Sequence, residues 1–307
     1  MHSLLIFMHL IVMTGAVQTV LIISSFVASS HIGATASAFC LRRLGHEAVI
    51  IPTTLMGRHP GWGAPGGGAV KTQQLEDIWT AIKSQDIIFD AVLTGYMGET
   101  AHIALAAKII RHVKSVNPQA YILVDPVMGD FQTTEQATGA GALYIPEPRA
   151  KAVCEHLIPL ANIITPNLWE LGYIGQKDLQ NAQDALAVLK DLGHSAIVTS
   201  VPYQTLGKPK EIGALFYDGK DSAIQSHHQK FTTVPHGGGD SLAGLYLGHY
   251  LRADTPRLAM RKSVSTLFEI MSLAHNLYKG GGGELPLIQA QNNMMNPTPL
   301  DFIELAL

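Results

Sequence analysis

Residues 234–251, VPHGGGDSLAGLYLGHYL, place three glycines and an aspartate directly before an apolar helical run. Glycines 237–239 lack a Cβ, so their backbone can approach a ligand closely. We expect the helix to begin near Asp240 or Ser241, and its first amides lack intrahelical partners and lie at the positive end of the helix dipole. Such a terminus binds anions, and Asp240 could take a proton from an attacking hydroxyl group. Phosphoryl transfer needs this combination, although a simple helix cap would use the same residues.

Polar side chains also recur where we expect strands to end. They are Ser24, Ser25, Thr53, Thr54, the residues from Thr94 to Tyr96, Asp125, Thr165, Asn167, Thr199 and Ser200. In parallel sheets, ligands bind at the carboxyl ends of the strands. Each of these residues alone is ordinary, but together they would surround a single crevice.

Strand-like and helix-like segments alternate along the chain. We expect strands at residues 20–23, 48–51, 91–93, 121–125, 162–167, 195–200, 213–217, 223–226 and 287–290. We expect helices from residue 32 to a stop at Gly45, and at 75–83, 99–116, 181–193, 241–251 and 256–278. This order predicts an α/β domain with a central, mostly parallel sheet and helices on both faces.

The composition is that of a globular protein, with 307 residues of which 47% are hydrophobic and 15% are charged. The net charge of −3, without a long basic run, argues against nucleic acid as a partner. The two cysteines, Cys40 and Cys154, form no metal or disulfide pattern, which favours a reducing cytoplasm.

The N-terminal residues are unusually apolar, and no charged residue precedes Arg42. The run 4–28 is long enough to span a bilayer, for which about 20 apolar residues suffice. His9 and Gln18 interrupt it, however, and it lacks the basic start of a signal peptide, so we disfavour a membrane anchor. We divide the chain into an apolar extension at 1–18, an α/β domain at 19–291 and a C-terminal tail at 292–307.

Several segments resemble the pyridoxal kinase branch of the ribokinase-like kinases. They are LRRLGHEAVIIPTTLMGRHPGWG at 41–63, LTGYMG at 93–98, YILVDPVMGD at 121–130, IITPNLWEL at 163–171 and GELPLIQAQ at 283–291. The glycine–aspartate turn is also similar to the Gly-Thr-Gly-Asp anion hole of that superfamily. The resemblance covers residues 19–291 and implies a ribokinase-like fold.

The resemblance also implies an activity: ATP-dependent phosphorylation of the 5′-hydroxymethyl group of pyridoxal, a form of vitamin B6. It implies Mg²⁺, leaves a monovalent cation open, and implies a cytoplasmic homodimer. Asp240 would be the general base, and the amides of Gly237, Gly238 and Gly239 would form the anion hole. The other implied roles are metal binding for Asp125, Asp130 and Glu170, nucleotide binding for Thr165, Asn167, Glu170, Thr199 and Ser200, and substrate binding for Ser25, Thr53, His59 and Tyr96.

The sequence departs from the family pattern around the expected site. Gly238 stands where the family has the anion-hole threonine. Ser24, Phe26 and Ser29 stand for a glutamine, a histidine and a tyrosine. Leu55 stands for a glutamine at the start of the flap, the segment that includes the loop at 57–68. We therefore expect weaker ATP binding and a less certain substrate. Two alternatives stay open: a kinase for hydroxymethylpyrimidine or another small alcohol, and a non-catalytic vitamin B6-binding protein.

Two further expectations concern surface features. The segment 130–146 is longer than usual for the family and is expected to form a local excursion. His102 and His112 are expected on the surface of a helix.

Overall fold

The computed structural model describes residues 17–131, 141–203, 211–231, 233–279 and 283–307. Residues 1–16 of the extension and 132–140 of the expected excursion lie outside this part of the chain. The strands are β1 (Thr19–Val27), β2 (Glu47–Met56), β3 (Gly68–Ala69), β4 (Ala91–Thr94), β5 (Tyr121–Val124), β6 (Gly129–Phe131), β7 (Gly141–Leu143), β8 (Ile163–Ile164), β9 (Ala196–Tyr203), β10 (Glu211–Tyr217), β11 (Ala223–Ser226), β12 (His228–Gln229) and β13 (Phe302–Glu304). The helices are α2 (Ala34–Arg43), α3 (Thr72–Lys83), α4 (Thr100–Val116), α5 (Glu147–His156), α6 (Leu168–Gly175), α7 (Ala182–Leu192), α8 (Gly238–Leu251), α9 (Pro256–Leu277) and α10 (Leu287–Ala290), with 3-10 turns η1 (Pro60–Trp62) and η2 (Ile158–Leu160).

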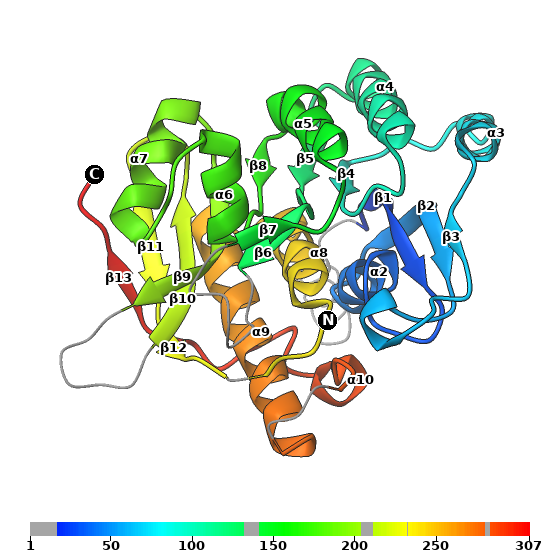
Figure 1. Cartoon of the computed structure of the whole chain (residues 1–307). Helices are drawn as coiled ribbons and strands as arrows, with labels where there is room; N and C mark the ends of the chain where they lie inside the picture. Colours follow the sequence, from blue (N-terminus) through cyan, green and yellow to red (C-terminus); the bar gives the residue numbers. More distant parts are fainter. Residues whose placement is uncertain (1–16, 132–140, 204–210, 232, 280–282) are drawn as a thin grey trace, which may run out of the picture.

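The described strands form one eleven-stranded sheet and a separate hairpin, β6–β7 (Figure 1). The order in the large sheet is β13-β11-β10-β9-β8-β5-β4-β1-β2-β3, and β12 also pairs with β10. The centre, from β2 to β9, is parallel, whereas β3 and the strands from β10 onward are antiparallel. The predicted mostly parallel α/β architecture is therefore confirmed.

Helices cover both faces of the sheet because both faces are apolar. In β1, Leu21 and Ile23 pack into one hydrophobic core with α3 to α7. The alternate residues, Val20 and Ile22, pack into a second core with α2, α8 and α9. Strands buried on both sides read as continuous apolar runs, which explains the sequence around residue 20. No helix in the described ranges is long and apolar enough to cross a membrane.

The last expected strand, residues 287–290, is wrong: these residues form helix α10. Leu287 and Ala290, three residues apart, are buried, whereas Ile288 between them is exposed, which is a helical rather than an alternating pattern. The tail at 292–307 contributes β13, which pairs antiparallel with β11 at the edge of the sheet.

Other expectations also differ from the structure. The helix after the glycine turn begins at Gly238, so two of the three glycines lie in its first turn. His102 is buried rather than on the surface, because it forms a capping box with Glu99 and its Nε2 lies 2.9 Å from the carbonyl of Val70. Helices α5 and α6 and the β6–β7 hairpin were not expected at all.

Two glycines allow α2 and α8 to pack closely. A Cβ on Gly244 would lie 2.7 Å from the backbone oxygen of Ser37 and 2.8 Å from its Cα. A Cβ on Gly248 would instead meet the side chain of Leu44, whose Cβ would be 3.2 Å away. The Oγ of Ser37 also donates to the backbone oxygen of Asp240 at 2.9 Å. This packing aligns the N-terminal ends of the two helices.

We expect Gly244→Ala to lower the free energy of unfolding by about 1–3 kcal/mol, because the added methyl group meets backbone that cannot move aside. Gly248→Ala should cost less, since the Leu44 side chain can rotate and alanine favours the helix by about 1 kcal/mol over glycine. Urea denaturation followed by circular dichroism measures both. Equal losses, or a larger loss for Gly248→Ala, would contradict this account of the helix contact.

Candidate active site

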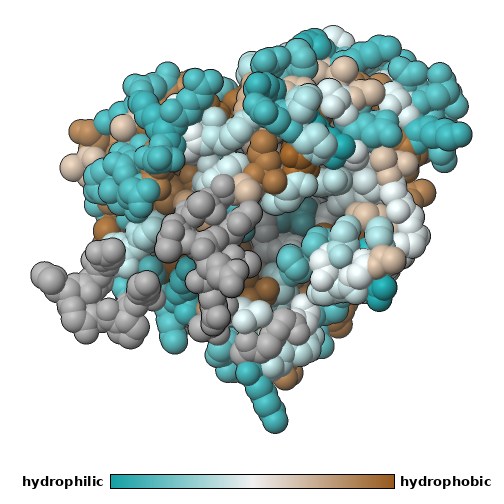
Figure 2. All heavy atoms as spheres, in the orientation of Figure 1, coloured by the Kyte–Doolittle hydropathy of each residue, from teal (hydrophilic) through white to brown (hydrophobic). Residues whose placement is uncertain are grey.

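The parallel strands end at a hollow in the molecular surface. The space-filling view shows this hollow near the centre of the face, between α8, α2 and α5, with mostly polar or intermediate residues inside it (Figure 2). The polar residues that we expected to surround a crevice follow these strands. Ser24, Ser25, Thr53, Thr54, Thr94, Asp125 and Thr165 are all buried there.

The glycine turn presents free amides at the start of α8. Gly237 has a φ of 94°, and a Cβ there would overlap the backbone oxygen of His31. The first intrahelical bond is donated by Ser241 to the carbonyl of Gly237, so the preceding amides of Gly238 and Gly239 have no intrahelical acceptor. A Cβ on Gly239 would lie 3.7 Å from Oδ2 of Asp125, which places the end of α8 beside that carboxylate.

Asp240 lies where the N-terminal ends of two helices meet. Its carboxylate accepts a hydrogen bond from the amide of Gly33, the residue before α2, while Asp240 itself lies in the first turn of α8. A Cβ on Gly95 would lie 3.8 Å from Oδ1 of Asp240, so the carboxylate also faces the end of β4. Burial raises the pKa of Asp240, while the bonds from Gly33 and its own amide lower it. The group is therefore a stronger base than an ordinary aspartate.

Asp125 directly follows β5 and is 6% exposed. Burial raises its pKa well above the ordinary value, and the nearby carboxylates of Glu170 and Asp240 raise it further, while the neighbouring hydroxyl group of Thr165 lowers it. Three carboxyl groups thus lie close enough to repel one another. Such a cluster favours the binding of a cation or proton.

Glu170 and Asn167 hold the loop that follows β5. They form a capping box at the start of α6, in which each side chain accepts the backbone amide of the other. Glu170 Oε1 also accepts the amides of Met128 at 2.7 Å and Gly129 at 3.3 Å, and Asn167 Nδ2 donates to the carbonyl of Gly129 at 2.8 Å. Burial raises the pKa of Glu170 to about 7, against the lowering effect of these amides. Both residues therefore have a positioning role in this structure.

The remaining proposed metal and nucleotide residues lie farther along this edge. Asp130 is exposed on β6, and its Oδ1 accepts the amide of Phe131 at 2.7 Å. Thr199 forms an isolated parallel bridge with Asn167, which brings β9 next to the start of α6. Ser200 has a φ of 59°, at the point where the register between β9 and β10 shifts. Asp130 thus lies toward the rim, and Thr199 lies beside Asn167.

The proposed substrate residues lie on the β1–β2 side. Ser25 is buried, and its Oγ and backbone leave no room for a Cβ on Gly33. Thr53 Oγ1 donates to the carbonyl of Tyr96 at 2.6 Å, so its proton is already used and it can only accept from a ligand. His59 lies in the flap, where its ring stacks on that of His236 with centroids 4.3 Å apart.

Sequence reasoning missed several residues of this site. Arg149 Nη1 reaches the hydroxyl of Tyr96 at 3.3 Å and the carbonyl of Met97 at 3.2 Å. Burial of the Tyr144 phenol raises its pKa well above the usual value, and the nearby carboxylates of the site raise it further, although 56% of the residue is exposed. Ser24, by contrast, was already expected at the crevice: it is buried next to Gly95, and its Oγ has no hydrogen-bond partner among the described residues. Arg149 and Tyr144 lie in or next to elements that the sequence did not reveal, whereas Ser24 follows a recognised strand.

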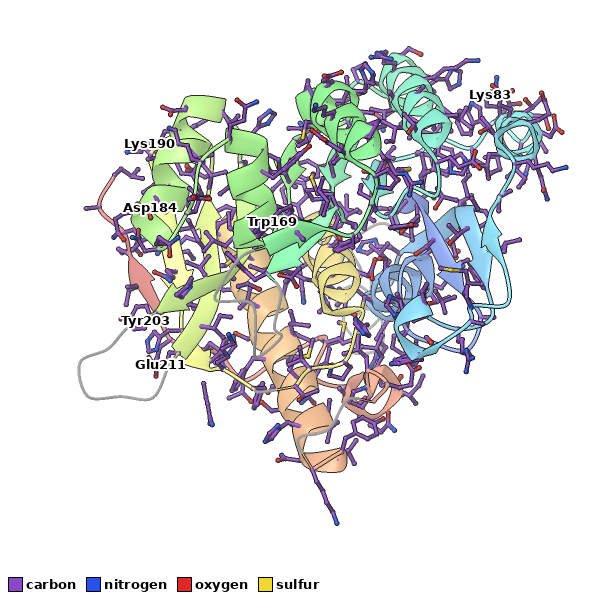
Figure 3. The ribbon with its side chains drawn as sticks, viewed as in Figure 1. Lys83, Trp169, Asp184, Lys190, Tyr203 and Glu211 are labelled. Carbon is purple, nitrogen blue, oxygen red and sulfur yellow. The ribbon has the colours of Figure 1, made fainter. Side chains whose placement is uncertain are left out.

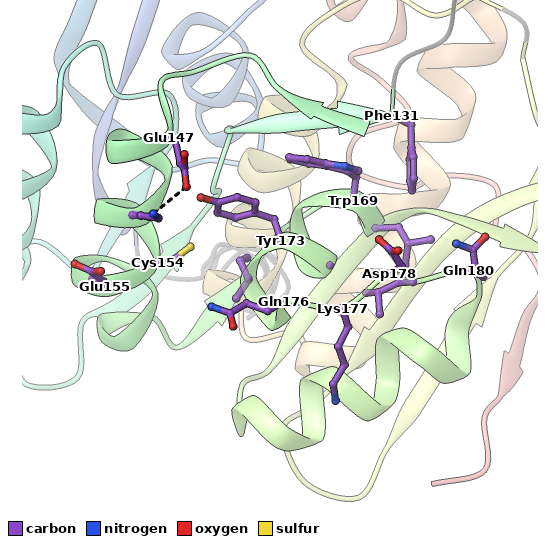
Figure 4. Close-up of a pocket in the computed structure, with 15 residues that line it drawn as sticks. Phe131, Glu147, Cys154, Glu155, Trp169, Tyr173, Gln176, Lys177, Asp178 and Gln180 are labelled. Atoms are coloured by element: carbon purple, nitrogen blue, oxygen red, sulfur yellow. Dashed lines mark ion pairs between the residues drawn. The ribbon is translucent and has the colours of Figure 1, made fainter. Parts of the chain in front are cut away.

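A pocket of about 930 Å³ opens on the opposite side of α6, where the rings of Trp169 and Tyr173 line it (Figure 4). Trp169 lies beside the β6–β7 hairpin (Figure 3). Its ring occupies the space that a Cβ on Gly129 would need. Helix α6 therefore has two faces: Asn167 and Glu170 face the carboxylate cluster, and the aromatic residues face the pocket.

We expect Asp125→Asn to raise the free energy of unfolding at pH 8 by about 1 kcal/mol or more. A carboxyl group whose pKa is raised on folding destabilises the folded state when it is ionised, at about 1.4 kcal/mol per pKa unit. Asp90→Asn is the matched control, because Asp90 accepts the amide of Thr19 at 2.8 Å and should lose about 1 kcal/mol. Urea denaturation of both variants tests this, and an equal loss for both would contradict the repulsion that we infer at Asp125.

Known proteins match this chain in sequence and in fold over most of its length. The phosphomethylpyrimidine kinase family matches residues 63–284. A pyridoxal kinase of Leifsonia xyli subsp. xyli is 28% identical over 284 residues, covering 91% of this chain and 96% of the relative. The human pyridoxal kinase is 26% identical and covers 91% and 95%. Two solved structures share the fold. Pyridoxal kinase from Leishmania donovani in complex with ADP and pyridoxamine has a TM-score of 0.82 at 20% identity, covering 94% of this chain and 100% of that chain. Pyridoxal kinase from Entamoeba histolytica has a TM-score of 0.80 at 21% identity, with the same coverage. Because this family matches well over half of its length, the chain belongs to the phosphomethylpyrimidine kinase family.

Proposed function

We propose that this protein is an ATP-dependent pyridoxal kinase, which transfers the γ-phosphoryl group of ATP to the 5′-hydroxymethyl group of pyridoxal. The observation that carries the proposal is the meeting of Asp240, Asp125 and the free amides of α8 at one edge of the sheet. The pyridoxal kinases that match nearly the whole chain support the same reaction.

Asp240 acts as the general base. The amide of Gly33 holds its carboxylate, and its raised pKa lies closer to neutrality than that of an ordinary aspartate. A base in this range takes a proton from an alcohol more effectively as the bond to phosphorus forms. Asp240 is half-buried, so it is open to the crevice on one side.

The free amides of Gly238 and Gly239 bind the phosphoryl group as it moves between ATP and the alcohol. These donors are fixed before the reaction begins, and the α8 dipole adds positive potential at the same point. Gly238 stands where the family has a threonine, and a Cβ there would lie 2.5 Å from the Cε of Met271. Met271 therefore fills the space of the missing side chain. Because the backbone amide remains but the threonine hydroxyl is absent, we expect weaker ATP binding.

Asp125 fits a role in binding Mg²⁺. Among the described residues, no three or more His, Cys, Asp or Glu side chains are spaced to enclose a metal ion. Mg²⁺ is usually held by one or two carboxylates and otherwise by water and phosphate oxygens, so a buried Asp125 without a cationic partner is sufficient. Bound there, Mg²⁺ would offset the charge of the phosphate oxygens. Glu170 positions the loop after Asp125. Asp130, exposed toward the rim, would bind waters of the metal ion.

Nucleotide and vitamer occupy opposite ends of the crevice in this proposal. Thr165, Asn167, Thr199 and Ser200 line the nucleotide end, and Ser25, Thr53, Tyr96 and His59 line the vitamer end. The Arg149 bond fixes the Tyr96 ring, and an aromatic face suits a flat pyridine ring. The family resemblance further supports a homodimer in the cytoplasm.

We expect Asp240→Asn to lower kcat by about 10²–10⁴-fold, because the amide cannot take the proton of the alcohol. The KM values for ATP and vitamer should change much less. The measurement is steady-state ADP release with pyridoxal as acceptor. Asp301→Asn, an exposed aspartate in the tail, is the control and should keep the activity of the unaltered enzyme. An unchanged kcat in Asp240→Asn would remove this residue from the mechanism, and no turnover in any variant would favour the non-catalytic binding protein.

The family description favours one other acceptor, hydroxymethylpyrimidine, which also carries a primary alcohol on a flat ring. We expect kcat/KM to be highest for pyridoxal or a related vitamer, pyridoxine or pyridoxamine. A direct comparison of these acceptors with hydroxymethylpyrimidine, at fixed ATP and Mg²⁺, tests the choice. Efficient turnover of the pyrimidine without turnover of any vitamer would reverse it.

A further inference from the structure

The flap contacts the glycine turn through a pair of stacked imidazoles. His236 directly precedes Gly237, and its ring lies against that of His59, with centroids 4.3 Å apart and planes inclined by 29°. Trp62 of the same flap meets both rings edge-on, at 5.9 Å and 6.1 Å. The flap thus rests on the residue next to the anion-binding amides.

The rest of the flap is held by its own backbone. The amides of Gly57 and Arg58 both donate to the carbonyl of Pro65, which closes the loop on itself. At its base, the Oγ and the amide of Ser29 both donate to the carbonyl of Gly57. These bonds fix the shape and root of the flap, whereas its outer part meets the glycine turn through His236, by the stack with His59 and the edge contact with Trp62.

The fit at this contact is tight. The Nδ1 of His59 accepts the amide of Gly61 at 3.1 Å, which fixes its ring. A Cβ on Gly61 would lie 3.0 Å from His59 Nδ1 and 3.3 Å from His236 Nε2. Both rings therefore pack closely against Gly61, and a side chain there would require them to shift by a few tenths of an ångström.

We propose that His236 is a positioning residue: by stacking on His59 it holds the flap closed over the alcohol and the glycine turn. The inference deepens the proposed function and rests on it, because a closed flap helps only an enzyme that must transfer the phosphoryl group to an alcohol and not to water. A closed flap excludes water, which would otherwise compete as acceptor.

The contact depends on uncharged rings. If both imidazoles were protonated, two like charges would face each other across the stack. Burial, and then the proximity of His236, lowers the pKa of His59, so its neutral form is the one that the folded protein favours. The stacking is therefore complete above the ordinary histidine pKa of about 6.5 and weakens as the pH falls through the lowered pKa of His59.

Other charged groups nearby are engaged elsewhere. Arg58 donates through Nε to the carbonyl of Ala64. From the β1–α2 loop, His31 Nδ1 lies 3.1 Å from the carbonyl of Leu285. Glu284 accepts the amide of His31 at 3.4 Å. None of these groups forms an ion pair with either ring of the stack in the described structure.

Limited proteolysis tests the contact without any substrate. Trypsin can cut after Arg58, which is exposed in the flap, and the fragment is identified by mass spectrometry. At pH 8 we expect His236→Ala to speed this cut by about 2–10-fold, the weight of one aromatic stack. His236→Phe keeps an aromatic ring and should retain the slow cut of the unaltered protein. Equal rates in all three proteins would overturn the proposal.

Kinetics at several pH values then test the link to the reaction. We expect His236→Ala to raise the KM for pyridoxal several-fold at pH 8 with a smaller change in kcat. In the unaltered enzyme this KM should rise between pH 7.5 and 5.5, and His236→Phe should reduce that rise, because a protonated His59 is still attracted to a phenyl ring. An identical pH profile in His236→Phe would overturn the role of the imidazole pair. A changed tryptic cut in a protein that phosphorylates no vitamer would instead refute the proposed function and leave the flap contact standing.

Discussion

The arrangement of the site depends on one contact, the close packing of α2 against α8. Gly244 lets the two backbones meet at Ser37, and the Ser37 hydroxyl then bonds to the backbone of Asp240. As a result, the N-terminal ends of both helices point at the carboxylate of Asp240, and free amides lie next to it. Neither helix alone would do this: α8 supplies the free amides, and the residue before α2 supplies the donor that holds the Asp240 carboxylate. This is the arrangement that the proposed reaction needs for an anion and a base.

Around this point the fold places groups that repel one another. Asp125, Glu170 and Asp240 are drawn together at the ends of the parallel strands, and burial makes the ionised form of each costly. The fold tolerates the cluster because backbone amides bind two of the three, Glu170 and Asp240. Asp125 is the exception, since no backbone amide of the described residues donates to its carboxylate and only the neighbouring Thr165 hydroxyl group favours its ionised form. A buried carboxylate without such a donor is suited to bind a cation, which in the proposed reaction arrives with the nucleotide.

Much of this was accessible from the sequence, because it follows from local patterns. The alternation of strand-like and helix-like segments predicted the mostly parallel sheet, and the glycines before an apolar run located the start of a helix beside Asp240. What failed depended on packing between distant segments. The short run at 287–290 was too brief to separate helix from strand by periodicity. Arg149 lies on a helix that follows an atypical segment, and the pairing of His59 with His236 joins residues that no local pattern connects.

The central claim is that the amides at the start of α8 bind the phosphoryl group during transfer. Its most direct measurement is NMR of protein labelled with ¹⁵N at glycine, with ADP, pyridoxal and aluminium fluoride as a mimic of the moving group. The account requires large downfield shifts of the Gly238 and Gly239 amide protons when all three components are present, and smaller shifts with ADP alone. Unshifted amides at both positions, in a complex that other glycine signals show to be fully formed, would contradict it.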